Sequence, residues 1–302
     1  MKVLLTGGTG QVGTAFAAAL PGAVELIAPP RAGFDLSRPD TLAAVLRAAA
    51  PDVIVNAAAM TAVERAEREP ALAQTINADA VAMLAATARE LDALLIHFST
   101  DYVFDGRKPG PYAETDATAP LNIYGASKLA GEAAIRASGA RHLILRTGWV
   151  YSATGRNFLT AILEQAAQAK ELRVVDDQHG APTWATDIAG IAVTLAQALP
   201  AEPAGSTRLG TFHCTATGET TWFGFAQAIL EETAALGVDP RARLVPVTAA
   251  EYGAAAVRPA NSRLACEKFV RTFGADIPLH PWRASLRHCL QLHNPAASHR
   301  AP

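Results

Sequence analysis

The chain has few cysteines, little charge and no long apolar run. Its three cysteines, Cys214, Cys266 and Cys289, have spacings that match neither a metal site nor a disulfide framework. No uncharged apolar stretch reaches about 18 residues, which argues against a transmembrane helix, and glycines after the first predicted strand interrupt any signal-peptide core. A net charge of −2 without a basic cluster argues against nucleic-acid binding. We therefore expect a cytoplasmic protein that binds neither membranes nor nucleic acids.

Three glycines follow a short apolar run at the start of the chain. Lys2 to Thr6 has no polar alternation, as expected for a parallel strand that is buried on both faces. Gly7, Gly10 and Gly13 come next, and then a helix-prone run. Such glycines permit a tight turn, a close approach of backbone to pyrophosphate and close packing of helix on strand, while the helix N-terminus offers free N–H groups. This pattern indicates a dinucleotide site.

The second predicted strand, 24–28, bears on the choice of cofactor. A carboxylate at its end would bind the ribose 2′-hydroxyl of NAD, but Pro29-Pro30-Arg31 stands there. Arg31 can pair with a 2′-phosphate, although a solvated loop residue is an equal alternative. We therefore expect NADPH and leave NADH open. Asp35 and Leu36 are candidate adenine contacts or, alternatively, the approach to the next helix.

A further buried strand ends in the small residues Ala57, Ala58 and Ala59. Small side chains at the carboxyl end of a strand leave room for a cofactor. Close packing alone is the alternative explanation for the three alanines.

Tyr124 and Lys128 lie four residues apart in a segment with helical periodicity, so they share one face of a helix. A free tyrosine has a pKa of about 10, and an adjacent ammonium lowers that pKa toward neutrality. The same ammonium can hydrogen-bond a nicotinamide ribose. Thr100 ends another apolar strand, where its hydroxyl can hydrogen-bond a substrate carbonyl. With the glycine loop, these three residues predict a hydride-transfer enzyme.

A set of short motifs spans nearly the whole chain. They comprise residues 7–13, 53–59, 61–64, 99–106, 114–116, 120–122, 124–125, 127–132, 146–147, 149–151, 157–158, 177–178, 180–183, 258–259 and 261–264. On these motifs the chain resembles the extended short-chain dehydrogenase/reductases and, within them, the dTDP-4-dehydrorhamnose reductase family. The combination is far more specific than any single motif.

The resemblance implies NAD(P)H-dependent reduction of the 4-keto group of dTDP-4-dehydro-L-rhamnose, the last step of dTDP-L-rhamnose synthesis. Tyr124 would donate the proton, Lys128 would assist it and Thr100 would orient the ketone. The further substrate contacts in this interpretation are Asp101, Val103, Trp149, Arg258 and Asn261. The further cofactor contacts are Gly10, Gln11, Val12, Asp35, Leu36, Ala59, Met60, Thr61 and Phe98.

Two of these substrate contacts have a structural alternative. Trp149 could be a core aromatic residue just after a strand. Arg258 suits a dianionic diphosphate, but a salt bridge to a nearby carboxylate explains it equally well.

The chain departs from the family at several positions. Pro30 stands where members often carry an acidic residue, and Met60 stands where histidine is common. Some relatives form a magnesium-bridged dimer through acidic side chains, but 14–16 contain no carboxylate here, and Asp187 is the only acid soon after Thr183. We therefore predict no metal site, doubt a role for Mg²⁺, and expect a monomer or a homodimer.

Two other functions stay open at this point. The family includes non-catalytic, NADP-binding regulatory homologues, but such a protein has little reason to keep Thr100, Tyr124 and Lys128 together. A sugar-nucleotide epimerase of the same superfamily is the second alternative. Dehydratases commonly add an Asp-Glu pair after the threonine, and Asp101-Tyr102 stands here instead.

Strand and helix patterns alternate up to about residue 150 and loosen afterwards. This predicts an α/β fold, with a Rossmann-type doubly wound parallel sheet and a smaller C-terminal α/β substrate-binding domain. We expect 1–150 to be the NAD(P)-binding domain, with 184–214 packing back on it. Residues 151–183 and 215–293 would form the substrate-binding domain, and 294–302 a disordered tail.

Overall fold

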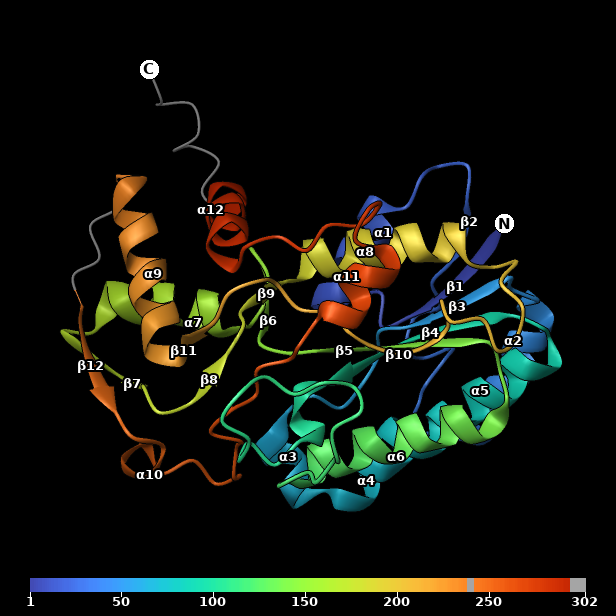
Figure 1. Cartoon of the computed structure of the whole chain (residues 1–302), viewed down its shortest axis with the longest axis horizontal. Coiled ribbons are helices and arrows are strands. Elements are labelled where there is room, and N and C mark those ends of the chain that lie inside the picture. Colours follow the sequence, from blue (N-terminus) through green and yellow to red (C-terminus); the bar gives the residue numbers. More distant parts are fainter. Residues whose placement is uncertain (238–241, 294–302) are drawn as a thin grey trace.

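The protein is built around a six-stranded sheet whose strands all run parallel (Figure 1). The computed structural model describes residues 1–237 and 242–293, so the predicted disordered tail, 294–302, lies outside the described residues. From edge to edge the strands are β10 (Gly210–His213), β5 (His142–Thr147), β4 (Leu94–Thr100), β3 (Val53–Asn56), β1 (Lys2–Thr6) and β2 (Glu25–Ile27). This sheet confirms the predicted Rossmann-type fold. Its chain order reverses between β1 and β3, the kind of point at which such sheets bind ligands.

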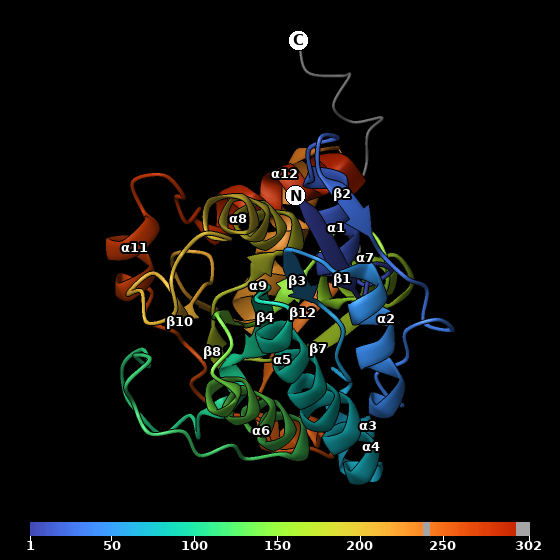
Figure 2. The same ribbon diagram turned by 90° about the vertical axis from the view of Figure 1, so that its right-hand side faces the viewer.

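Helices cover both faces of this sheet (Figure 1 and Figure 2). One face carries α1 (Gln11–Ala19), α8 (Ala185–Ala198) and α11 (Glu267–Phe273), and the other carries α2 (Leu42–Ala49), α5 (Ala80–Glu90) and α6 (Ile123–Ser138). Alternate strand residues enter the two cores: Val3 and Val53 pack on the α1 side, and Leu4 and Ile54 on the α5 side. Because both faces are covered, all seven residues of β4 are buried.

The chain returns to this sheet after leaving it. β10 pairs in parallel with β5, and α8 contributes Ile188 and Leu195 to the same core as Phe16 of α1. Both elements therefore lie against the first part of the chain, while the assignment of 184–214 to the NAD(P)-binding domain stays a prediction. The exact division into two domains stays a prediction.

A second group of elements has its own core, seen on the left of Figure 1. It contains α7 (Phe158–Gln168), α9 (Trp222–Ala235), α12 (Trp282–His293), α10 (Ala249–Tyr252) and the parallel pair β7 (Glu171–Val175) and β12 (Arg243–Val247). Two shorter pairs connect it to the sheet: β6 (Val150–Tyr151) with β9 (Thr183–Trp184), and β8 (His179–Gly180) with β11 (Thr220–Thr221). Within the described ranges, no helix is both long and apolar enough to span a membrane.

The helix before β4 contains a π-helical turn. Residues 70–90 run as α4 (Pro70–Gln74), the π segment Thr75–Asp79 and then α5, with α3 (Val63–Arg68) before them. Gly131 of α6 lies against this turn, since a Cβ on Gly131 would come within 2.2 Å of the Asn77 carbonyl oxygen. π-turns of this kind occur frequently at functional sites, and here the turn places the Asn77 side chain between α6 and the loop after β3.

A buried carboxylate joins α6 to the sheet. Glu132 is fully buried, and its Oε1 accepts hydrogen bonds from Ser99 Oγ at 2.6 Å and Arg146 Nε at 2.9 Å. Its Oε2 accepts from Arg146 Nη2 at 2.7 Å and from Arg136 at 3.0 Å. Burial alone would raise the pKa of Glu132, but the bonds and charge of Arg146, together with the bonds from Ser99 and Arg136, leave that pKa below its usual value.

Replacing Arg146 with methionine should lower the free energy of unfolding by about 3–5 kcal/mol, because it leaves the buried Glu132 without its main partner. The side chain of Arg136 contacts the same carboxylate but is 42% exposed, so Arg136→Met should cost less than about 1 kcal/mol. Urea denaturation of both variants measures the difference. Equal losses would show that the buried pair does not hold α6 in place.

Candidate active site

The glycine loop forms a tight turn between β1 and α1. Gly7 has a φ of +68°, and a Cβ there would lie 2.7 Å from the backbone nitrogen of Ala58. A Cβ on Gly13 would lie 2.1 Å from the carbonyl oxygen of Gly7, so the helix packs directly on the turn. No side chain caps α1 and no acid occupies its first turn, so its N–H groups are available to an anion. Gln11 adds a buried side-chain oxygen, Oε1, with no partner among the described residues. These features fit the pyrophosphate of a dinucleotide.

The segment after β2 presents a charged residue to solvent. The Arg31 side chain is 74% exposed and lies 3.5 Å from Asp35 in an ion pair. Asp35 also accepts a backbone hydrogen bond from Ser37, which is the main reason why its pKa lies below the usual value. Leu36 is buried in the core on the α5 side. Arg31 is therefore exposed apart from its pairing with Asp35, while the Leu36 side chain is committed to packing.

The loop after β3 is held from two sides. Thr6 Oγ1 accepts a hydrogen bond from the Ala58 nitrogen at 3.2 Å. The Asn77 amide accepts from the Met60 nitrogen at 2.9 Å, and donates to the Met60 oxygen at 3.1 Å and to Ser127 Oγ at 3.0 Å. Asn77 thus fixes the loop to α6. In the same loop Ala57 to Ala59 are half-buried, Met60 is buried and Thr61 is exposed.

The predicted catalytic residues meet where β4 ends and α6 begins. Thr100 Oγ1 donates to Asp101 Oδ1 at 2.9 Å and accepts from the Tyr102 nitrogen at 3.1 Å. Tyr124 lies in the first turn of α6. A Cβ on Gly125 would come within 2.2 Å of the Tyr102 carbonyl oxygen, so only glycine permits this approach. The approach places Tyr124 close enough to Thr100 for the threonine to affect the pKa of the phenol, and the Tyr124 ring lies edge-on to Tyr102 with centroids 5.9 Å apart.

Lys128 lies under this site and is almost fully buried. Its Nζ donates to the Phe98 carbonyl oxygen at 2.7 Å and lies 3.0 Å from His97 Nε2. Burial lowers the pKa of Lys128 to about 8, although the nearby Glu132 raises it in part. Phe98, a predicted cofactor contact, therefore also contributes its carbonyl oxygen to the lysine.

The acid–base properties of the site differ from the sequence-based interpretation. The pattern predicted that Lys128 would lower the pKa of Tyr124, but burial raises that pKa to about 12, and the Thr100 contact lowers it only in part. Burial also raises the pKa of Asp101 to about 6. In the described part of the chain, Asp101 Oδ2 is buried without a hydrogen-bond partner. The site thus holds a protonated phenol beside a carboxylate oxygen that is free to accept a hydroxyl.

Trp149 is tightly held just after β5. Its φ of +52° is rare for a large side chain, and its Nε1 donates to Ser262 Oγ at 3.0 Å. The ring stacks on Trp222 with centroids 3.6 Å apart and planes 2° from parallel. Gly180 also lies against the indole, because a Cβ on Gly180 would come within 2.3 Å of Trp149 Cε2. The indole is 8% exposed, so any ligand meets an edge of a fixed ring.

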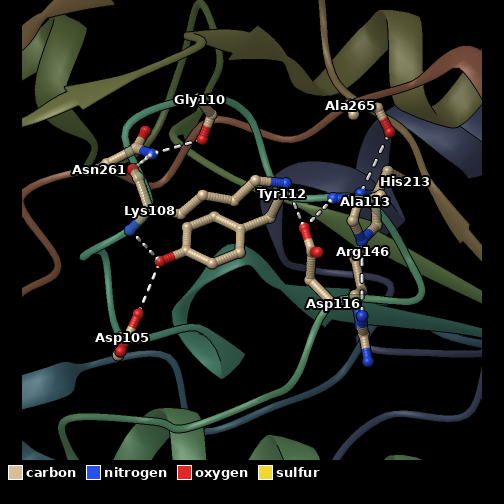
Figure 3. Close-up of polar contacts among 10 residues, drawn as sticks. All are labelled: Asp105, Lys108, Gly110, Tyr112, Ala113, Asp116, Arg146, His213, Asn261 and Ala265. Carbon is tan, nitrogen blue, oxygen red and sulfur yellow. Dashed lines mark hydrogen bonds and ion pairs between the residues drawn. The ribbon is translucent and has the colours of Figure 1, made fainter.

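Two predicted substrate contacts already have partners within the chain. Arg258 forms an ion pair with Glu64 of α3 and is also close to Tyr102. Figure 3 shows the Asn261 amide facing the backbone of the 105–116 loop, where Nδ2 donates to the oxygens of Lys108 at 2.7 Å and Gly110 at 2.8 Å. Asn261 therefore holds this loop in place.

The 105–116 loop has further internal bonds that Figure 3 also shows. The Tyr112 hydroxyl donates to Asp105 at 2.6 Å and accepts from the Lys108 nitrogen at 3.0 Å. Val103, another predicted substrate contact, is fully buried with Phe104 and Tyr112. Its side chain belongs to this small core, which supports the segment that follows the catalytic strand.

Three residues without a predicted role also take part in the site. His97 contacts Lys128, Glu64 pairs with Arg258, and Trp222 stacks on Trp149. A histidine within an otherwise apolar strand was the one available signal for His97. In the described ranges, no group of three or more His, Cys, Asp or Glu residues is placed to hold a metal ion.

This fold and site define a class of protein. A parallel sheet with a dinucleotide loop, and a Thr, Tyr and Lys set at the carboxyl end of its fourth strand, belong to the extended short-chain dehydrogenase/reductases. The chain is therefore an oxidoreductase that uses a nicotinamide cofactor.

Comparison with known proteins identifies the family. A family model described as the RmlD substrate binding domain matches residues 1–294. A dTDP-4-dehydrorhamnose reductase from Burkholderia thailandensis is 45% identical over 295 residues, which cover 96% of this chain and 98% of the relative. The chain belongs to the dTDP-4-dehydrorhamnose reductase family, which confirms the resemblance found in its motifs.

Solved structures agree with this assignment. A crystal structure of a dTDP-4-dehydrorhamnose reductase from Clostridium acetobutylicum matches with a TM-score of 0.89 at 33% identity, over 97% of this chain and 99% of that one. The same enzyme from Bacillus anthracis, in complex with NADP, matches with a TM-score of 0.87 at 31% identity, over 96% and 98% of the two chains.

Proposed function

We propose that this protein reduces the 4-keto group of dTDP-4-dehydro-L-rhamnose to give dTDP-L-rhamnose, with NADPH as the preferred reductant. The observation that carries the proposal is the close approach of α6 to the end of β4, which places Tyr124 near Thr100, with Lys128 on the same helix. Relatives of this name are similar over nearly the whole chain, which favours this function over a regulatory homologue or an epimerase.

The chain's own residues suit the cofactor. The turn at Gly7 to Gly13 and the first turn of α1 would hold the pyrophosphate, and Ala57 to Thr61 would lie along the adjacent part. A bound reduced nicotinamide supplies the hydride. The Lys128 nitrogen, fixed by Phe98 and His97, keeps a further hydrogen available for a ribose hydroxyl, since an ammonium has three.

Tyr124 would act as the proton donor. A pKa of about 12 keeps its hydroxyl protonated at neutral pH, as a general acid requires. The Thr100 hydroxyl would bind the same carbonyl oxygen and share the negative charge that develops on it. Lys128, when charged, stabilises the phenolate that remains after the proton has moved. Asp101 Oδ2 would accept a hydroxyl of the sugar.

The remaining assignments are also proposals. Arg31 would bind the 2′-phosphate of NADPH, with Asp35 and Leu36 near the adenine. Trp149 and the Val103 segment would border the sugar, and Arg258 would reach a substrate phosphate only by giving up part of its pairing with Glu64. Independence from Mg²⁺, a monomer or homodimer, and a cytoplasmic location stay predictions.

Replacing Tyr124 with phenylalanine should lower kcat by about 100-fold or more, because general acid catalysis contributes about that much. NADPH consumption at 340 nm with dTDP-4-dehydro-L-rhamnose measures the rate. NADPH binding should persist in the variant, and Tyr252→Phe, at a residue 58% exposed, serves as the control. No turnover by the wild type would favour the regulatory alternative or another keto sugar.

The rate of reduction should fall as the pH rises past about 8. Burial lowers the pKa of Lys128 to about 8, so the ammonium is present below this pH and is lost above it. Tyr124 stays protonated throughout that range. A profile of kcat/KM from pH 6 to 10 gives the pH at which the rate begins to fall, that is, the alkaline limb of the profile. A limb that appears only above pH 9 would contradict this assignment.

Arg31→Ala should weaken NADPH binding by about 10-fold, the effect of losing one hydrogen-bonded charge pair, and should leave NADH binding unchanged. NADH binding by the same variant is thus the control. Titration of each cofactor, followed by protein fluorescence, measures both constants. An equal loss for both cofactors would mean that Arg31 does not contact the 2′-phosphate.

A further inference from the structure

A row of buried polar side chains crosses the sheet beneath the active site. Thr6 of β1, Asn56 of β3 and His97 of β4 stand in register on adjacent strands. Thr6 Oγ1 lies 2.6 Å from Asn56 Oδ1, the Asn56 amide lies 2.9 Å from His97 Nδ1, and His97 Nε2 lies 3.0 Å from Lys128 Nζ. All four side chains are at most 2% exposed. The row therefore links the ends of the strands that precede both cofactor loops to the catalytic lysine.

The hydrogen bonds of this row can be completed in two patterns, one for each charge state of Lys128. A charged Lys128 has no lone pair and must donate, so His97 Nε2 accepts and the ring proton lies on Nδ1, facing the oxygen of Asn56. A neutral Lys128 has a lone pair, and this lone pair is satisfied when His97 donates to it, with the ring proton on Nε2 and Nδ1 accepting from the Asn56 amide nitrogen. A half-turn of the Asn56 amide changes one pattern into the other. The Thr6 hydroxyl can donate or accept, and it suits both patterns.

We propose that His97 is a positioning residue for Lys128, which holds the lysine nitrogen in one place by changing its neutral tautomer as Lys128 loses or regains a proton. An unpaired buried donor or acceptor would otherwise appear in one of the two charge states, at a substantial cost. The proposal rests on the proposed function only for the catalytic role of Lys128. The hydrogen-bond chain itself requires no substrate.

The charges around the pair are compatible with this behaviour. Burial, together with the charge of Lys128, holds the pKa of His97 well below its usual value, so the imidazole stays neutral. Lys128 itself changes charge near pH 8. Helix α6 contributes Glu132 to its surroundings, and β5 contributes Arg146, which is paired with that carboxylate.

The other neighbouring elements add little charge. β1 and β3 offer only the uncharged Thr6 and Asn56, and the π segment offers Asn77. Asp101, after β4, and Tyr124, on α6, lie on the substrate side of the site. Among the described residues, Glu132 is therefore the opposite charge that acts on Lys128.

The test is a measurement of imidazole ¹⁵N chemical shifts on the whole chain, without substrate or cofactor, from pH 6 to 10. The His97 signals are assigned by their loss in His97→Gln. We expect a neutral ring throughout, with its proton on Nδ1 below about pH 8 and on Nε2 above. Lys128→Met is the matched control and should keep one tautomer over the whole range. A single tautomer in the wild type, a tautomer change that persists in Lys128→Met, or protonation of His97 near pH 6.5 would overturn the proposal.

Two substitutions at His97 separate its two contacts. Glutamine places an amide near the former Nε2 and can donate to or accept from Lys128, whereas asparagine keeps only the contact with Asn56. His97→Asn should lower kcat by about 10- to 100-fold, since the lysine is no longer held. It should also move the alkaline limb to lower pH, because the ammonium loses an acceptor that favours its charged form.

His97→Gln should retain the wild-type limb and a kcat within about threefold of wild type. His213→Gln removes another fully buried imidazole, on β10, and should leave the limb unchanged. Equal loss of kcat in both His97 variants, with no movement of the limb, would reduce His97 to a structural role. The shift measurement is independent of turnover, so it still decides the proposal if the protein reduces a different substrate.

Discussion

The rest of the active site depends on the buried carboxylate of Glu132. It binds Ser99 on β4 and Arg146 on β5, so a single residue of α6 is bonded to the two strands whose carboxyl ends border the site. A carboxylate without water is stable only when such bonds are complete. Since hydrogen bonds require a defined length and direction, these bonds prevent α6 from shifting along the sheet. Tyr124 and Lys128 therefore keep their position relative to Thr100.

Backbone contacts determine how close α6 can come. Gly125 lies against the Tyr102 carbonyl and Gly131 against that of Asn77, at distances that leave no space for a Cβ. The π turn at Asn77 directs its side chain to Met60 and Ser127, so one amide joins the cofactor loop to the catalytic helix. The positions of Tyr124 and Lys128 are thus determined largely by the backbone approaches at Gly125 and Gly131 and by the Asn77 amide.

Much of the fold and the core of the site could be predicted, because the glycine loop, the strand ending in Thr100 and the Tyr124–Lys128 pair are local patterns. Contacts between distant residues carry no such signal: Asn77 binds Met60 across 17 positions, Lys128 meets His97 across 31, and Arg258 meets Glu64 across 194. The direction of the Tyr124 pKa shift was missed for a related reason. It depends on how completely the phenol is removed from water, which spacing along a helix does not reveal.

The late position of β10 in the chain has a consequence for biosynthesis. β5 must leave the ribosome well before Gly210–His213, its neighbour in the sheet, has been made. Until then β5 is an unpaired edge, and the apolar face that α8 and α11 later cover has no partner. Although N-terminal parts of proteins generally fold first during synthesis, this sheet is complete only after Gly210–His213 has been made. In that interval the nascent chain exposes an unpaired strand edge beside an uncovered apolar face, a combination that favours pairing with another chain.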